Sequence, residues 1–302
     1  MPSGKYPPKK SVTARKERNR PGQSLKKQPY NRDKRVILLP KRVAAARYCT
    51  VPHTFVNMER KFSQEFVIQS PMVDFRKNLR AVSFMSMCQE MAYTGAERLG
   101  FGYSSLDRHH TAWVLARMNI RFNSLPQWQD TVTLTTWHKG MQGPFFLRDF
   151  ELSDATGRIV AAATSSWVVI DSIDRHMLRS DHLTLMQDFS GPCESHAIEQ
   201  PASKVVMPKG VPVDFVTEHT VQFSDIDFIG HTNNTRYLEW AFDCIPPKAL
   251  EEYRVSEITI NYNQESHWGD TVTLSHTAAD NLHSIEGSSN GRQIFIAGIR
   301  LA

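Results

Sequence analysis

The chain has 302 residues, 40% of them hydrophobic, and a formal net charge of +5, so it is long enough for two domains of ordinary size. No apolar run approaches the length that a membrane-spanning helix needs. The four cysteines lie far apart without a C-x-x-C pair, which argues against a zinc site or a disulfide scaffold and suits a reducing compartment.

The positive charge belongs to one end of the chain. Residues 1–47 carry fifteen Lys and Arg against two acids, a net charge of +13, which leaves residues 48–302 at −8. The segment is rich in Pro, Asn and Gln, so we predict a disordered basic tail over residues 1–57. Such a tail could bind nucleic acid or an anionic surface, and its scarcity of acids also fits a transit peptide. We favour a plain unstructured extension and expect no nucleic-acid partner.

The first half of the remaining chain combines one helix with a run of strands. Its expected elements are a strand over 62–68, a helix over 82–99, and strands over 113–122, 131–137, 145–152 and 158–170. Apolar residues occur around most of the helix, so we expect it to be buried on most sides. In the strand over 113–122 we expect one apolar face, made of Val114, Met118, Ile120 and Phe122.

The second half repeats this order in less space. Its expected elements are a strand over 219–223, an amphipathic helix over 233–244, and strands over 255–263, 271–278, 282–287 and 292–301. Pro246 and Pro247 are expected to end the helix. Between the halves, residues 191–212 are rich in Pro, Gly and Ser, which is typical of a linker.

Seven residues occur twice, 140 positions apart. Residues 128–134 read W-Q-D-T-V-T-L and residues 268–274 read W-G-D-T-V-T-L, so only the second position differs. A tight turn followed by alternating Thr and apolar residues predicts the entry into a half-buried strand. Its recurrence suggests that one unit was duplicated and that both halves share a fold.

These patterns favour an α+β fold in which a long antiparallel sheet wraps around one central helix, made twice in tandem. We predict domains over residues 58–190 and 219–302, joined by a linker over 191–218. A unit of five strands and one helix has open edges, so side-by-side pairing of the two units would protect edge strands.

The loop over residues 224–234 concentrates more polar chemistry than any other part of the body. It lies where a strand leads into the second helix, and a helix N-terminus presents N–H groups and partial positive charge suited to an oxyanion. Asp227 and His231 place an acid and a titratable base four residues apart there, with Gly230 between them. Together they supply what hydrolysis of a carbonyl compound needs. For Asn233 and Asn234 we favour helix capping or backbone hydrogen bonding.

No competing catalytic motif is present. The sequence has no G-x-S-x-G elbow, no P-loop and no G-x-G-x-x-G followed by a suitable helix. His109 and His110 are adjacent without carboxylate partners, so a solvated loop is favoured over a metal site. Arg117 and Arg121 share one strand face, which usually means a solvated face.

Taken together, these segments resemble the acyl-acyl-carrier-protein thioesterases, which are double hot-dog proteins. The segments that carry the resemblance are residues 113–118, 126–132, 166–169, 225–237 and 262–265. The resemblance runs from about residue 62 to residue 301, and both halves in order are much more specific than the loop alone. It implies two tandem hot-dog domains that hydrolyse fatty acyl thioesters of acyl carrier protein (ACP).

The resemblance implies catalytic roles for Asp227, His231 and Glu265. Glu265 occurs five residues before the aspartate of the repeated turn, where the first half has Leu125, so only one half carries this carboxylate. The first half also lacks a D-x-D-x-x-G-H pattern before its helix. We therefore expect its cavity to be the acyl pocket and the second half to be catalytic.

Two positions depart from the family. The family usually has an asparagine two residues after the catalytic Asp, and this chain has Ile229, whose side chain cannot donate a hydrogen bond. We therefore expect backbone N–H groups of the loop, at Ile229, Gly230 and Asn233, to bind the oxyanion. The position after the glutamate, often cysteine in plant members, is Ser266, so no cysteine nucleophile is available there.

We predict an enzyme, a thioester hydrolase that releases free fatty acid from acyl-ACP, with ACP as its partner and no metal or cofactor. Glu265 or Asp227 would activate water, with His231 as proton shuttle or orienting partner. The alternatives are an acyl-CoA thioesterase of the hot-dog class and a catalytically silent acyl-thioester-binding protein, which Ile229 would favour. We expect a cytoplasmic protein, or a protein of the plastid stroma if the tail is a transit peptide. A homodimer is compatible with the sequence.

Overall fold

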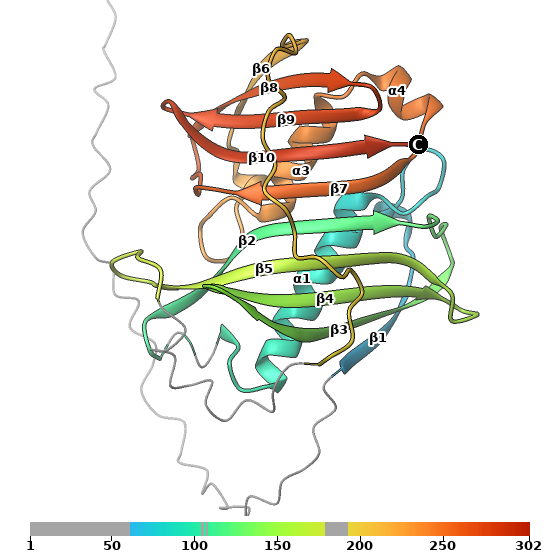
Figure 1. Ribbon diagram of the computed structural model, residues 1–302, viewed down its shortest axis with the longest axis vertical. Helices are drawn as coiled ribbons and strands as arrows, with labels where there is room; N and C mark the ends of the chain where they lie inside the picture. Colours follow the sequence, from blue (N-terminus) through green and yellow to red (C-terminus); the bar gives the residue numbers. More distant parts are fainter. Residues whose placement is uncertain (1–60, 104–105, 107, 179–192) are drawn as a thin grey trace, which may run out of the picture. The chain divides into compact units, whose positions relative to one another are not determined.

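Ten antiparallel strands form one continuous sheet, and the two longest helices pack against one of its faces (Figure 1). The computed structural model describes residues 61–103, 106, 108–178 and 193–302. The predicted basic tail over residues 1–57 lies outside the described residues.

The order of elements along the chain confirms the predicted repeat of strand, helix and four strands. The elements of the first half are β1 (Lys61–Val67), η1 (Ser70–Met72), α1 (Ala81–Arg98), β2 (Thr111–Phe122), β3 (Thr131–Gln142), β4 (Phe145–Asp154) and β5 (Ile159–Asp171). Those of the second half are β6 (Phe215–Thr220), η4 (Phe223–Asp225), α3 (Asn234–Asp243), α4 (Pro247–Glu252), β7 (Val255–Tyr262), β8 (Thr271–Ala279), β9 (Leu282–Ser289) and β10 (Arg292–Leu301).

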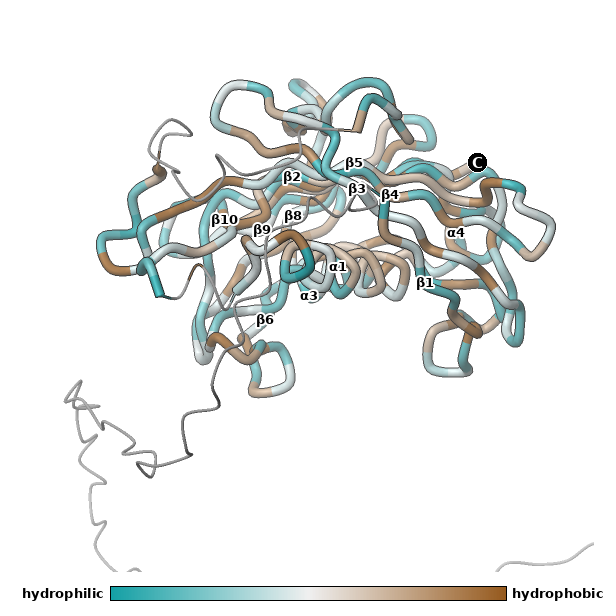
Figure 2. Tube along the Cα trace, turned by 90° about the horizontal axis from the view of Figure 1, so that it is seen from below, coloured by the Kyte–Doolittle hydropathy of each residue, from teal (hydrophilic) through white to brown (hydrophobic). Residues whose placement is uncertain are grey.

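Helix α1 lies in the hollow of the curved sheet beside α3 (Figure 2). Eleven of its 18 residues are buried, as predicted from the apolar residues around it. Phe84 and Met85 are fully buried and Met91 is 1% exposed. Because burying a side chain of this size contributes about 1.5–3 kcal/mol, the contact between helix and sheet is a large part of the core energy.

The two halves join through β2 and β7. The strand order is β1-β3-β4-β5-β2-β7-β10-β9-β8-β6, and β2 pairs with β7 from Arg117 opposite Asn261 to Arg121 opposite Glu257. The side-chain amide of Asn119, 6% exposed, donates across this seam to Thr259 Oγ1 at 2.8 Å. The predicted side-by-side pairing is therefore present, and it hides one edge of each five-stranded unit.

The duplicated seven residues form the same turn twice. The Asp130 carboxylate accepts the N–H of Gln127, and the Asp270 carboxylate accepts the N–H of His267, at 2.8 and 2.9 Å. The one position that differs is the left-handed residue of the turn, with φ of +75° at Gln129 and +87° at Gly269. Glycine adopts this conformation without strain, so the two turns share a shape although their residues differ.

Strand β2 departs from the predicted alternation. The register against β5 shifts between Leu115 and Arg117, which leaves Ala116 as the extra residue of a β-bulge. The bulge brings Leu115, 2% exposed, into the core beside Met118, whereas Val114 is half-buried. The prediction that Val114 shares the core face was therefore wrong, because a bulge reverses the parity of the residues before it.

The second half differs from prediction at both ends of its helix. Strand β6 runs from Phe215 to Thr220 instead of over the predicted 219–223. It ends before Phe223 because the chain there forms η4, which Gln222 and Asp225 stabilise with a capping box. Beyond α3, Pro247 occupies the first turn of the short helix α4, which was not predicted. Proline suits the first position of a helix, so the Pro-Pro pair ends one helix and begins the next.

Of the linker predicted over 191–218, residues 193–214 are bound to the sheet on the face opposite the helices, and residues 215–218 belong to β6 (Figure 1). The Trp137 indole donates to Ser195 O at 2.7 Å, and Asp149 accepts the N–H of Ala197 at 2.8 Å. Asp149 is fully buried and lies 3.4 Å from the ammonium of Lys139. Burial raises the pKa of Asp149, and these donors oppose that shift. The exact domain boundaries over 58–190, 191–218 and 219–302 stay a prediction.

A buried histidine pair makes stability depend on pH. His276 and His283 lie on β8 and β9, 2% and 6% exposed, with Nε2 and Nδ1 2.9 Å apart. Burial lowers the pKa of both imidazoles. At mildly acidic pH the two histidines are therefore protonated more fully in the unfolded chain than in the folded chain, which favours unfolding. Their contribution is complete above the unfolded pKa, near 6.5, and is lost as pH falls below it. The slope is at most about 1.4 kcal/mol per pH unit for each histidine.

Urea unfolding at neutral and mildly acidic pH tests this prediction. The double variant His276→Gln/His283→Gln replaces the pair with amides that do not titrate, and we expect it to lose less stability on acidification than the unmodified chain. Equal losses in the two proteins would mean that other groups cause the acid sensitivity.

Candidate active site

The loop between η4 and α3 is held by hydrogen bonds at both of its ends. At its start, the Asp225 carboxylate accepts the N–H of Gln222 at 2.7 Å and lies 2.9 Å from His219 Nε2. At its end, Asn233 caps α3 by accepting the N–H of Thr235 at 2.9 Å. The predicted capping role of Asn233 is confirmed.

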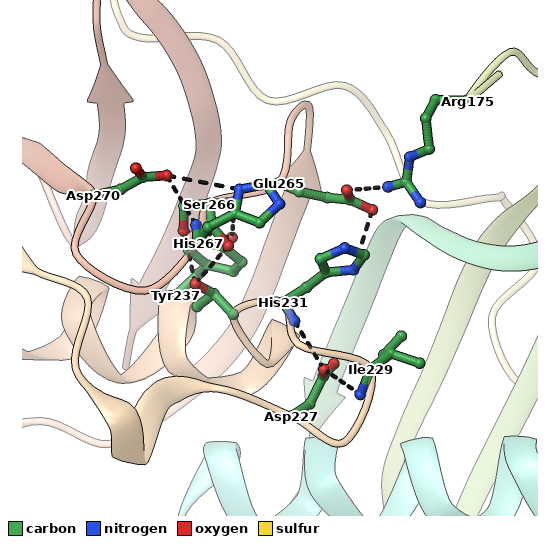
Figure 3. A network of polar contacts seen from close by, with 10 residues as sticks. Arg175, Asp227, Ile229, His231, Tyr237, Glu265, Ser266, His267 and Asp270 are labelled. Carbon is green, nitrogen blue, oxygen red and sulfur yellow. Dashed lines mark hydrogen bonds and ion pairs between the residues drawn. The ribbon is translucent and has the colours of Figure 1, made fainter. Parts of the chain in front are cut away.

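Asp227 fixes the shape of the loop. Its Oδ1 atom accepts the N–H groups of Ile229 and His231 at 3.0 and 3.1 Å (Figure 3). Its carbonyl oxygen accepts the N–H of Gly230 at 3.1 Å. A short carboxylate that binds backbone donors two and four residues on stabilises a tight turn. This turn presents the side chain of His231.

His231 and Glu265 lie together at the edge of this loop. His231 Nδ1 is 3.6 Å from Glu265 Oε1, and both side chains are partly exposed, at 25% and 32%. The second oxygen of Glu265 bonds to the guanidinium of Arg175 (Figure 3). One carboxylate thus bridges an imidazole of the second half and a cation of the first half.

Arg175 was not predicted as a site residue. It follows β5 in a turn in which Asp171 Oδ1 accepts the N–H groups of Ile173 and Asp174 at 2.7 and 2.9 Å. These two donors lower the pKa of Asp171. The D-x-x-D run after a strand signals such a turn, but the sequence has no signal for the partner of Arg175 in the other half.

A buried hydroxyl network fixes the segment that carries Glu265. The neighbouring residue, Ser266, is fully buried; its N–H donates to Tyr237 Oη at 3.1 Å, and its carbonyl oxygen accepts the hydroxyl of Thr232 at 2.9 Å. Burial raises the pKa of Tyr237, so its hydroxyl stays protonated at neutral pH. The network joins α3, the loop and the end of β7, and it thereby sets the place of the carboxylate relative to the imidazole.

Three of these side chains have the spacing of metal ligands. Ligand atoms of His231, Glu265 and His267 lie within 4.8 Å of one another. The other carboxylate oxygen of Glu265 already faces the positive charge of Arg175, which opposes a cation at this place. The geometry thus favours a role for His231 and Glu265 without a metal.

A cavity of about 760 Å³ opens beside the loop. The loop contributes Asp227, Ile229 and Asn234 to its wall, and most of the remaining wall comes from α1, β2 and β4. Apolar residues of the first half that line it include Ala92, Tyr93, Ala96, Phe101, Trp113 and Phe146. The space adjoins the loop between η4 and α3 and lies mainly in the first half of the body.

The three predicted oxyanion donors have partners inside the protein. The N–H groups of Ile229 and Gly230 bond to Asp227, and the N–H of Asn233 bonds to Asp225 O at 2.8 Å. These donors stabilise the loop: the N–H of Ile229 donates to the carboxylate of Asp227, whereas those of Gly230 and Asn233 donate to the backbone carbonyl oxygens of Asp227 and Asp225. In this respect the structure differs from the sequence prediction.

Known protein families match the chain in both halves. The acyl-ACP thioesterase N-terminal domain matches residues 59–182, and the acyl-ACP thioesterase C-terminal domain matches residues 209–296, which together are well over half of the chain. The chain belongs to the acyl-ACP thioesterase family. The predicted family and its class of activity, thioester hydrolysis on acyl-ACP, are therefore confirmed.

Curated members of the family are distant relatives. The oleoyl-ACP thioesterase 2 of Arabidopsis thaliana, a chloroplastic protein, is 27% identical over 259 residues, which cover 77% of this chain and 68% of that protein. The chloroplastic palmitoyl-ACP thioesterase of Cuphea hookeriana is also 27% identical, over 72% of this chain and 55% of its own length.

Solved structures of the family share the fold. The 12:0-ACP thioesterase of Umbellularia californica superimposes with a TM-score of 0.74 at 21% identity, covering 82% of this chain and 99% of that one. An acyl-ACP thioesterase of Bacteroides thetaiotaomicron gives a TM-score of 0.67 at 23% identity, covering 80% and 98%. The predicted α+β fold of two tandem hot-dog domains is confirmed.

Ser266, where plant members often have cysteine, now has a physical account. Its Oγ lies 2.9 Å from Tyr237 Oη and 2.8 Å from Thr232 Oγ1, and no part of it is exposed. Ser266 is not among the residues that line the cavity. Its hydroxyl takes part in the network with Tyr237 and Thr232, for which it is a stronger hydrogen-bonding group than the thiol of a cysteine.

We predict that Arg175 orients Glu265 without taking part in the chemistry. Arg175→Gln should lower kcat about tenfold with little change in KM, because Glu265 loses the partner that fixes one of its oxygens. Arg175→Lys should retain part of the rate, since it keeps the charge but loses the planar fork. The matched control is Arg158→Gln, which removes an exposed ion pair with Asp154 at 3.1 Å. Steady-state kinetics in which the two Gln variants are equal would contradict this role.

Proposed function

We propose that the chain hydrolyses fatty acyl-ACP and releases free fatty acid, with His231 as general base and Glu265 as its charged partner. The observation that carries this proposal is the pair of side chains 3.6 Å apart, next to a loop that lines a partly open, mainly apolar cavity. Acyl thioesters need a base for water and an apolar space for the chain, and this arrangement supplies both.

The reaction would begin with a water molecule held between His231 Nε2 and the thioester carbonyl carbon. His231 takes a proton from the water as the oxygen forms a bond to carbon, and the carbonyl electrons move onto oxygen. The charge of Glu265 stabilises the imidazolium that forms. Collapse of the intermediate breaks the carbon–sulfur bond, and the leaving thiolate takes the proton from His231, which leaves a fatty acid and free thiol.

Asn234 is our proposed donor to the oxyanion. It is the first residue of α3, lines the cavity and has no hydrogen-bond partner for its N–H among the described residues. A helix N-terminus offers both an unpaired N–H and partial positive charge to a developing anion. This assignment replaces the predicted donors at Ile229, Gly230 and Asn233, whose N–H groups are occupied.

The cavity of the first half would take the acyl chain, while the second half supplies the chemistry. The carrier is proposed to be ACP, because the curated relatives are named for this substrate. Competition between acyl-ACP and acyl-CoA of one chain length tests the carrier, since an acyl-CoA thioesterase of the hot-dog class would favour CoA. Absence of hydrolysis of both would favour a silent binding protein.

The place of the protein in the cell follows from its carrier. We propose that it works in the compartment where fatty acids are made on ACP, which is the plastid stroma or the cytoplasm. None of the helices in residues 61–103, 108–178 and 193–302 is long and apolar enough to cross a bilayer. Gel filtration of the full chain tests the homodimer.

We expect His231→Ala and Glu265→Gln each to lower kcat by about 10²–10⁴, the usual contribution of general acid–base catalysis. Asp227→Asn should cost less, because an amide oxygen can still accept the N–H groups of Ile229 and His231. Single-turnover kinetics with octadecenoyl-ACP measure the losses, and thermal unfolding checks that each variant folds. A larger loss for Asp227→Asn than for Glu265→Gln would make Asp227 the base.

Ile229→Asn restores the amide that the family usually has at this position and should raise kcat. Ile229 lines the cavity and is half exposed. An asparagine amide at this position can therefore reach the substrate without being buried away from a hydrogen-bond partner. A preorganised oxyanion donor typically contributes about 2.7–4 kcal/mol, and because the loop is already shaped around isoleucine we expect a gain in kcat smaller than this figure implies. Turnover of the two proteins on one acyl-ACP decides the matter. A fall in turnover at unchanged stability would show that Ile229 serves the acyl chain.

A further inference from the structure

A buried cation lies in the wall of the cavity. Arg148, on β4, is 7% exposed and lines the same space as Asp227 and Ile229. Within the part of the chain that the structure describes, its guanidinium makes one side-chain hydrogen bond, from Nη1 to Thr136 Oγ1 at 3.3 Å. No carboxylate among the described residues forms an ion pair with it.

The charge on Arg148 persists despite burial. Burial lowers the pKa of the guanidinium to about 10, so it is protonated at neutral pH. The neighbouring His138 is neutral there, because burial and the charge of Arg148 lower its pKa to about 4. Arg148 is therefore the one positively charged side chain among the described residues that line the cavity. A buried charge without a counter-charge is unfavourable unless another group hydrogen-bonds it.

Helix α1 leaves room for this guanidinium. Gly95 lies inside α1, and a Cβ atom built on it would be 3.0 Å from Arg148 Nη1. Glycine is a poor helix residue, so Gly95 makes α1 less stable than an alanine at the same position would. In return, the guanidinium can pack against the helix backbone at the border of the cavity. Two positions, on β4 and α1, thus combine to hold a cation where an acyl chain would lie.

We propose that Arg148 forms a polar subsite of the cavity that binds an oxygen acceptor carried by the acyl chain, a carboxylate or a hydroxyl group. This inference rests on the proposed function, because it requires that the acyl chain enters this cavity. The guanidinium has five donors in a planar fork, and a carboxylate accepts two of them side by side. An unsubstituted chain that reaches Arg148 would displace water from the guanidinium and offer nothing in its place.

The test compares acyl-ACP substrates of equal length that differ only at the far end. Octanoyl, decanoyl and dodecanoyl thioesters are measured beside their ω-hydroxy and ω-carboxy counterparts with the full chain. At the length that reaches Arg148, we expect the oxygenated substrate to have a kcat/KM about tenfold higher or more, because a site built to hydrogen-bond a group rejects the analogue that lacks it. The hydroxy and carboxy series show which acceptor the subsite takes.

Variants of Arg148 link this preference to the guanidinium. In Arg148→Met the ratio of oxygenated to plain substrate should fall at least tenfold, and plain chains should gain in absolute rate. Arg148→Lys should retain part of the ratio, because it keeps the charge and loses the fork. The matched control is Arg158→Met on the exposed surface, which should leave the ratio unchanged. Thermal unfolding reports whether each variant folds.

If Arg148→Met does not fold, the ratio measured with the unmodified chain and with Arg148→Lys still decides. Gly95→Ala provides a further variant, since its methyl group would lie 3.0 Å from Arg148 Nη1, and the shift of the guanidinium that this requires should lower the ratio. The inference would be overturned if plain chains were hydrolysed in preference at every length and no variant changed the ratio of oxygenated to plain substrate. The proposed function would remain intact. Absence of hydrolysis of every substrate would overturn the proposed function itself.

Discussion

The pairing of β2 with β7 is the constraint on which the rest of the structure depends. Both β5 and β7 are antiparallel to β2 and flank it on either side, so they run in the same direction. The C-terminal ends of β5 and β7 therefore point the same way, on the two sides of β2. Arg175 follows one of these ends and Glu265 follows the other, which is why an ion pair can join residues 90 positions apart. Without the seam, neither half would contain the complete arrangement.

The two halves share a fold because one unit was duplicated, and the polar site arises from residues that only the second half carries. The repeated turn fixes the residues before β3 and β8 in the same conformation, with an aspartate binding the backbone in each. Only the second copy precedes its turn with a carboxylate and a serine that reaches a buried tyrosine. The energetic cost of burying these hydroxyls is offset because each finds a partner. The second half can therefore hold a polar site that the first half does not.

Local chemistry made much of the fold predictable from the sequence. Period-two and helical patterns, together with turn residues, indicated nearly all of the long elements, and the loop before α3 indicated His231. The bulge at Ala116 was not predictable, because it depends on pairing with β5 and leaves no distinctive residue. Arg175 and Arg148 were missed for a related reason. A charged residue gives no sign in the sequence of whether it meets solvent, a carboxylate of the other half or a cavity.

The location of the cavity follows from side-chain volume on the two helices. Helix α1 turns Ala92 and Ala96 toward the cavity, whereas α3 carries Tyr237 and Trp240 into its own core. The Tyr237 ring lies 5.2 Å from that of Phe295 and 5.1 Å from that of Trp240, measured between centroids. These rings fill the space beneath the second half of the sheet, where the network around Ser266 needs rigid support. Small residues on α1 leave the matching space beneath the first half open. One frame thus gives a packed half that positions His231 and Glu265 and a half with an open cavity.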